Sequence, residues 1–140
     1  MISSRFSVAI HVLALIGITE EGKVTSEFIA GSVNTNASVI RRIMGMLSRA
    51  DLIASKAGVA GIRLKRELMD ITLLDVYRAV ELPEEHVLFT VHQGTNLQCP
   101  VGRNIQSALE QPLHKAQEQM EQVLMKTTIY DIVQSIKSKC

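Results

Sequence analysis

The stretch that decides the fold runs from residue 34 to residue 50 and reads Asn34-Thr-Asn-Ala-Ser-Val-Ile-Arg-Arg-Ile-Met-Gly-Met-Leu-Ser-Arg-Ala50. Apolar residues recur in it at helical spacing and would share one face: Val39, Ile43, Met46 and Leu47. The opposite face is polar and cationic and carries Ser38, Arg41, Arg42, Gly45 and Arg49. A helix with an apolar side for the core and a free cationic side is typical of a recognition helix that enters a DNA groove.

The residues before this helix predict a helix-turn-helix. Helical spacing of apolar residues predicts a first helix over 3–18. A short helix follows over 25–32, in which Phe28 and Ile29 are expected to point inward. Because an asparagine side-chain oxygen can accept the first free backbone N–H groups of a helix, Asn36 is expected to cap the helix that follows it.

The residues after it predict a wing and a further helix. Residues 52–65 hold two short extended runs around the Gly-bearing loop 57–61, which is typical of a hairpin. A helix is expected over 70–80, where Thr72 and Asp75 have the spacing of a capping box. A hairpin directly after a helix-turn-helix indicates a winged helix.

The C-terminal half predicts a loop and a long helix. Residues 84–100 show no periodicity, whereas 101–126 repeat apolar residues every three or four positions. Such a helix would be about 39 Å long, more than a small domain needs, so its apolar stripe is expected to meet another subunit. Pro112 should kink or interrupt it. Thr128 is expected to cap a last helix.

Composition favours one small helical protein. Of 140 residues, 46% are hydrophobic and only 4% aromatic, which suits helices better than a sandwich or barrel. The apolar N-terminal run is interrupted by His11, so it is expected to be a structural helix and not a signal peptide. No apolar run approaches the roughly 18 residues that a membrane span requires. The two cysteines, Cys99 and Cys140, do not form a disulfide framework, and we expect a cytoplasmic protein.

Charge is divided unevenly along the chain. The net charge is +1, but residues 1–66 carry nine basic and four acidic residues, a net of +5, while 67–140 carry a net of −4. A basic N-terminal face would attract phosphates. A chance split with no partner is the alternative. We therefore expect a DNA-binding domain over 1–82, and a sensor-type loop with dimerisation helices over 83–140.

The motifs in this order resemble the Rrf family of winged-helix transcription regulators, over nearly the whole chain. The matching stretches are Ser3-Ser-Arg-Phe-Ser-Val-Ala-Ile-His-Val-Leu13, Leu47-x-x-Ala50-x-Leu52-Ile53-x-Ser55, Gly58-x-x-Gly61-x-x-Leu64, Ile71-Thr-Leu-Leu-Asp-Val-Tyr-Arg-Ala-Val-Glu81 and Cys99-Pro-Val-Gly-Arg-Asn104. The resemblance implies a mainly α fold, a winged helix-turn-helix with a two-stranded wing and a long C-terminal dimerisation helix. It also implies a sequence-specific repressor that binds a near-palindromic operator as a homodimer.

The sequence departs from the family pattern at several places. Ala57 and Ala60 stand where the family wing has arginine and glycine, so a minor-groove arginine is not expected there. Ser38 matches a base-contacting serine of the family. Arg41 stands where the family's iron–sulfur cluster regulator has glutamate, so this chain should read a different DNA sequence.

Cluster-binding members of the family have three cysteines in the loop before the long helix, and this chain has only Cys99 there. One thiolate does not hold a cluster, so we expect no iron–sulfur cluster and no other cofactor. Cys99 would be either a redox sensor or an inert remnant of an ancestral site. His86 and His92 lack the tight spacing of metal ligands with it, and no metal site is expected.

The residues expected to contact double-stranded DNA are Asn36, Ser38, Arg41, Arg42, Arg49, Lys56, Arg63 and Lys65. Arginines on the recognition helix suit guanine edges, whereas wing lysines would hold phosphates. For each charge the alternative is a solvated surface. The sequence shows no catalytic constellation, so no enzyme is expected. The alternative function is a protein-interaction adaptor with little DNA affinity, and the chain could also respond to an unknown effector or protein partner.

Overall fold

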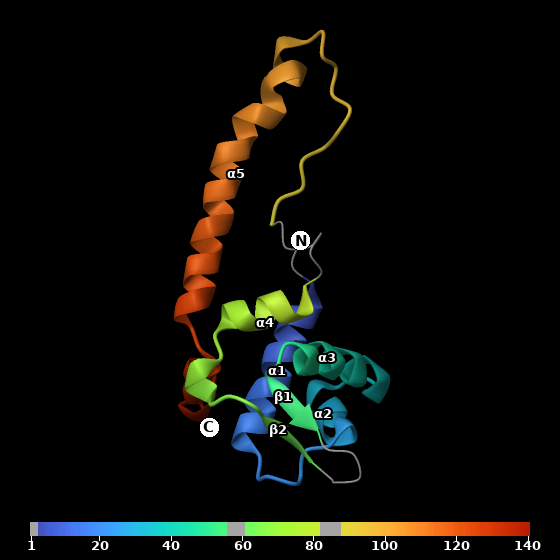
Figure 1. The fold of residues 1–140 in the computed structure, drawn as a ribbon, viewed down its shortest axis with the longest axis vertical. Coiled ribbons are helices and arrows are strands. Elements are labelled where there is room, and N and C mark those ends of the chain that lie inside the picture. The colour runs from blue at the N-terminus through green and yellow to red at the C-terminus, as the bar shows by residue number, and fades with distance from the viewer. Residues whose placement is uncertain (1–2, 56–60, 82–87) are drawn as a thin grey trace.

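The described part of the chain, residues 3–55, 61–81 and 88–140 of a computed structural model, is a winged helix from which one long helix projects (Figure 1). Its elements in order are α1 Ser4–Ile18, α2 Ser26–Val33, α3 Ala37–Arg49, β1 Ile53–Ser55, β2 Ile62–Leu64, the short 3-10 helix η1 Leu68–Asp70, α4 Leu73–Val80, α5 Pro100–Lys126 and α6 Ile129–Lys137. The predicted fold class, mainly α with a two-stranded wing and a long C-terminal helix, is confirmed.

The core lies where α1, α3 and α4 meet. Leu13 of α1, Ile40 of α3 and Val76 of α4 have no exposed surface. Ile29 of α2 is also fully buried, as predicted, but Phe28 is 45% exposed, so the prediction that it points inward is wrong. The Thr25 side chain accepts a hydrogen bond from the Phe28 backbone N–H, so Phe28 lies in the first turn of α2.

The core face of α3 differs from the predicted one at one position, where Ile40 is buried in place of Val39. Ile40, Ile43 and Leu47, at 0–2% exposed, make the core contact, whereas Val39 is 38% exposed. Positions i, i+3 and i+7 align along one side of a helix. Because Ile40, Ile43 and Leu47 occupy the buried side, Val39 faces outward. Asn36 caps α3 as predicted, because its side chain accepts a hydrogen bond from the Val39 backbone N–H.

The wing is a two-stranded antiparallel sheet. Ile53 pairs with Leu64, and Ser55 pairs with Ile62. Gly61 has φ +109° and packs so closely on the turn before α2 that a Cβ would lie 2.8 Å from the Cα of Gly22. A side chain is therefore excluded at Gly61 for both conformational and steric reasons. Lys56, Ala57 and Ala60 lie outside the described residues.

The link to the C-terminal helices is a short backbone ladder. Leu73 N donates to Thr127 O and Ile129 N donates to Ile71 O, both at 2.9 Å. Thr72 and Thr128 face each other in this ladder, and each caps a helix, as predicted. The capping box expected at Thr72 is present, and Thr128 forms a second one with Asp131. The ladder fixes α6 beside α1 at the base of the long helix (Figure 1).

The long helix α5 runs for 27 residues, and none of them is buried. It continues through Pro112, so the predicted interruption does not occur; proline removes only one hydrogen bond of a ladder that stays intact on both sides. Irregular chain runs along it, with Leu88 N donating to Gln117 Oε1 at 2.9 Å and Gln106 Nε2 donating to His92 O at 3.0 Å. Among the described helices, none is long and apolar enough to span a bilayer.

Candidate nucleic-acid interface

The N-terminal half of α3 presents a polar face to solvent. Ser38, Arg41 and Arg42 are exposed on it, while Ile40 and Ile43 hold the helix against the core. The rotation of α3 is therefore fixed by packing, and the three polar side chains project on the side away from the core. The structure brings these three predicted residues together.

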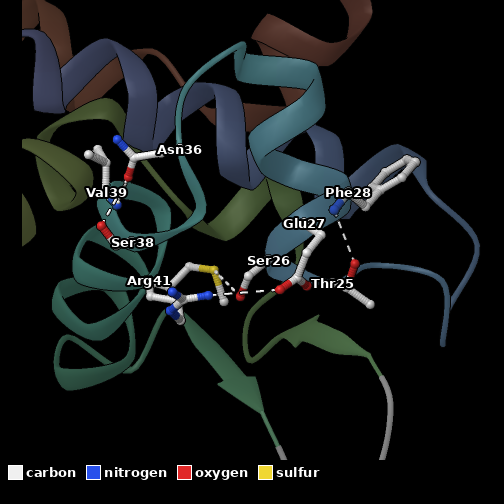
Figure 2. Close-up of polar contacts among 9 residues, drawn as sticks. Thr25, Ser26, Glu27, Phe28, Asn36, Ser38, Val39 and Arg41 are labelled. Carbon is white, nitrogen blue, oxygen red and sulfur yellow. Dashed lines mark hydrogen bonds and ion pairs between the residues drawn. The ribbon is translucent and has the colours of Figure 1, made fainter.

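Asn36 organises the start of this face. Its Oδ1 accepts hydrogen bonds from the backbone N–H of Val39 and from the hydroxyl of Ser38, both at 3.0 Å (Figure 2). The oxygen is thus engaged in capping, and the Ser38 hydroxyl is held at the helix entry. Asn36 lies at the predicted site, with its oxygen in a structural role.

Arg41 faces a carboxylate that sequence reasoning missed. Its Nη1 lies 3.8 Å from Oε1 of Glu27 in the first turn of α2, with 58% and 76% of the two side chains exposed (Figure 2). The neighbouring Arg42 is exposed and makes no ion pair with any described residue. No local sequence signal pointed to the pair, because the two residues lie on different helices.

A groove of about 540 Å³ opens beside this pair, between α2, α3 and the two strands of the wing. Its walls carry several hydroxyl groups, together with Glu27 and Arg41, and the hydroxyl residues are Thr25, Ser26, Ser48 and Ser55. The Ser26 hydroxyl contacts the Met44 sulfur at 3.9 Å and joins the two helices at the rim (Figure 2). Hydroxyls and a guanidinium beside a groove suit phosphate and sugar oxygens.

The other predicted cations are spread more widely. Arg63 is exposed on β2 and makes no ion pair with the described residues, whereas Lys65 Nζ donates to Asp51 Oδ1 at 3.1 Å. Arg49 lies in the last turn of α3, about 16 Å along the axis from Ser38. Lys56 falls outside the described residues. Of the eight predicted residues, seven are described, and these seven are divided between α3 and its start, the strand β2 and the residue that follows it.

Val39 is an additional exposed residue on this face, lying in sequence between Ser38 and the arginines. Sequence reasoning had placed it in the core. The signal that could have found it is the competing apolar set Ile40, Ile43 and Leu47, which fits a single helical stripe. An exposed valine on such a face suits contact with a thymine methyl group.

The family model of Rrf2, described as an iron-dependent transcriptional regulator, matches residues 2–135. The chain belongs to the Rrf2 family. The resemblance inferred from the sequence motifs is confirmed, and the chain is a transcription regulator of this family with a winged-helix DNA-binding fold. The family is one of regulators and not of enzymes.

Relatives support the assignment across the full length. The Bacillus subtilis protein YwnA, named as a proposed HTH-type transcriptional regulator, is 48% identical over 133 residues, which cover 95% of this chain and 97% of YwnA. A crystal structure of a proposed DNA-binding protein is 43% identical, with a TM-score of 0.74, and covers 92% of this chain and 98% of that one. The Bacillus subtilis cysteine regulator CymR shares the fold at 19% identity, with a TM-score of 0.72 and coverage of 96% and 97%.

The family description names iron, so the donor set of this Rrf2 chain matters. Cys99 and Cys140 are both exposed free thiols, and only Cys99 lies before α5. Within the described residues, no group of three His, Cys, Asp or Glu side chains is placed to hold a metal. A single thiolate does not match the three or four strong ligands of a cluster. The donor set therefore does not fit one, and the absence of a cluster stays a prediction.

Cys99 occupies the N-cap position of α5, and Pro100 is the first residue of the helix. Backbone N–H groups of Gly102 and then Val101 point at its sulfur and lower the pKa of the thiol, because they stabilise the negative charge of the thiolate. Desolvation opposes this shift only weakly at an exposed position. Cys99 is thus an accessible thiol with more thiolate at a given pH than an ordinary cysteine has.

Proposed function

We propose that this Rrf2-family regulator is a homodimeric repressor that places the N-terminal half of α3 in the major groove of a near-palindromic operator. One observation carries the proposal. Ser38, Val39, Arg41 and Arg42 form an exposed face on a helix whose opposite side is locked into the core by Ile40, Ile43 and Leu47. A probe held this rigidly keeps its side chains in register with base edges.

The proposed contacts are of two kinds, those with base edges, which recognise the sequence, and those with phosphates, which position the protein. Arg41 and Arg42 would donate to guanine O6 and N7, and Val39 would contact a thymine methyl. Arg49, Lys56, Arg63 and Lys65 would hold phosphates and carry little sequence information. In this division, residues 1–82 form the DNA-binding domain, and 83–140 form the dimerisation and sensor part.

Dimerisation is supported by the exposure of α5. Val101 and Val123, near its two ends, are 68% and 64% exposed, and no residue of this helix is buried. A helix of this length with uncovered apolar residues is stabilised when a second copy covers them. Pairing through α5 would set two recognition helices about 34 Å apart, one turn of DNA.

We further propose that Cys99 makes the regulator responsive to oxidants. Its thiolate would attack a peroxide oxygen, forming sulfenic acid and releasing the other oxygen as water after protonation. The exposure of the sulfur and its lowered pKa favour this role. A comparison of operator binding by wild type and Cys99→Ser, with and without peroxide, tests it, and identical responses would remove it.

The main proposal is tested by selecting bound fragments of the source genome and measuring affinity against salt concentration. A near-palindromic consensus bound by two chains is expected, with affinity falling steeply as salt rises, since phosphate contacts release counterions. Failure to bind DNA even at low salt concentration would favour the adaptor alternative. Repression itself is measured with a reporter gene placed behind the selected operator.

A further inference from the structure

Glu27 is an acidic residue at the edge of a surface that should meet DNA. It extends from the first turn of α2, and its carboxylate is 76% exposed. A carboxylate beside the DNA phosphates repels them, and that weakens binding to every sequence. We therefore expect Glu27 to have a role next to Arg41 that compensates for this loss of affinity.

The distance between the two charges defines that role. Arg41 Nη1 and Glu27 Oε1 are 3.8 Å apart, close enough for electrostatic attraction but too far for a hydrogen bond (Figure 2). The guanidinium N–H donors consequently stay available for a base, while the carboxylate limits the positions that the long arginine side chain takes. Limiting those positions before binding reduces the entropy lost on binding.

The backbone that carries this exposed carboxylate is well anchored. The carboxylate sits at the positive end of α2, where a negative charge is favourable. The start of α2 contacts α3 through Ser26 and Met44, and Ile29, one turn later, is buried in the core. As a result, the backbone of Glu27 is held in place beside α3, and its carboxylate extends from there to Arg41.

We propose that Glu27 is a positioning residue that sets the base preference of Arg41. The inference rests on the proposed function, because it requires α3 to read DNA. In water the exposed pair contributes little to folding stability. When DNA covers the pair and excludes water, the attraction strengthens and holds the guanidinium over one base pair. Glu27 thus exchanges some overall affinity for discrimination at one position.

The test compares Glu27→Gln with Arg41→Ala and with the double variant, each measured on the selected operator and on operators altered at one base pair at a time. Glu21→Gln is the matched control, since it removes the same charge from an exposed residue in the turn before α2. Glu27→Gln should bind unrelated DNA more tightly. At the base pair that Arg41 reads, its discrimination should fall roughly three- to tenfold.

The double variant carries the decisive result. If Glu27 acts through Arg41, then Glu27→Gln should cause no further loss of discrimination once Arg41 is alanine. Additive losses, or a Glu27→Gln profile that equals that of Glu21→Gln, overturn the inference while leaving the proposed function intact. Wild-type protein without any sequence preference overturns both.

Discussion

Ser3 donates two hydrogen bonds to Oε1 of Glu81, one from its backbone N at 3.2 Å and one from its hydroxyl at 3.0 Å. Glu81 follows α4, so the start of α1 is joined to the end of α4 across 78 positions of sequence. The Glu81 side chain has no exposed surface, and Arg5 Nη2 lies 3.6 Å from its other oxygen. A buried carboxylate with these partners fixes α1 at the place where the winged helix ends.

Replacing Glu81 with alanine should destabilise the fold by about 3 kcal/mol, because Arg5 and the Ser3 donors would lose a buried charged partner. Thermal or urea unfolding at fixed protein concentration measures the change in free energy. Glu20→Ala is the control, since Glu20 makes an exposed pair with Lys23 and should change stability by less than about 0.5 kcal/mol. Equal effects of the two substitutions would contradict the role given to Glu81.

Contacts between residues close together in the sequence could be predicted, and contacts between distant residues could not. The caps at Asn36, Thr72 and Thr128 depend on residues within three positions, and all three were predicted correctly. Ser3 was also expected near the start of a helix, yet its hydroxyl binds Glu81 and makes no capping hydrogen bond. Only the fold brings Glu81 within reach, so no local pattern could have shown this partner.

The candidate site follows the same rule. The exposed arginines of α3 were predicted from one helix, because a single helical wheel separates them from the core. The Glu27–Arg41 pair joins two helices, so it could be found only once the packing of α2 against α3 was known. The outward placement of Val39 could have been predicted, since the sequence contained the competing stripe of Ile40, Ile43 and Leu47 that the core selects.

Asn36 offers a way to separate capping from DNA contact. Asn36→Asp keeps an oxygen for the Val39 N–H, so stability should be retained, but it adds a negative charge at the helix entry. Operator affinity should therefore fall, and fall most at low salt, where repulsion from phosphates is least screened. Asn36→Ala should instead cost about 1 kcal/mol of stability. Unfolding curves measure the stability, and fluorescence anisotropy measures the operator affinity. Unchanged affinity of Asn36→Asp would show that Asn36 does not lie close to the DNA phosphates.

Arg41 and Arg63 should respond differently to truncation. Arg41→Ala should lose about 1–3 kcal/mol of discrimination at one base pair. Arg63→Ala on the wing should weaken binding to all DNA sequences alike. It should also reduce the slope of log affinity against log salt concentration by about one. Affinities for a set of single-base operator variants at several salt concentrations distinguish the two patterns. If both substitutions lowered the affinity for all operator variants equally, Arg41 would contact phosphates and not a base.

Val123 tests the dimer through α5. It is 64% exposed in the single chain, so Val123→Asp should leave the fold of each protomer intact. Burying the new carboxylate against a second copy is costly, so sedimentation should show monomers at concentrations where the wild type is dimeric. Gln122→Asp, also exposed, places the same charge one position away as the control. A dimeric Val123→Asp protein would exclude this part of α5 from the interface.

Cys99 should be alkylated at a lower pH than an ordinary thiol. Backbone N–H groups of Gly102 and Val101 stabilise its thiolate and lower its pKa, so the rising limb of the rate against pH shifts toward acid. Iodoacetamide labelling of a Cys140→Ser protein, followed by mass spectrometry, measures this limb at one thiol. The same protein unfolded in urea is the matched reference, because unfolding removes the two N–H groups from the sulfur while the residue stays unchanged. Coincident profiles for the folded and unfolded chains would show that the start of α5 does not activate Cys99, and the proposed response to oxidants would lose its physical basis.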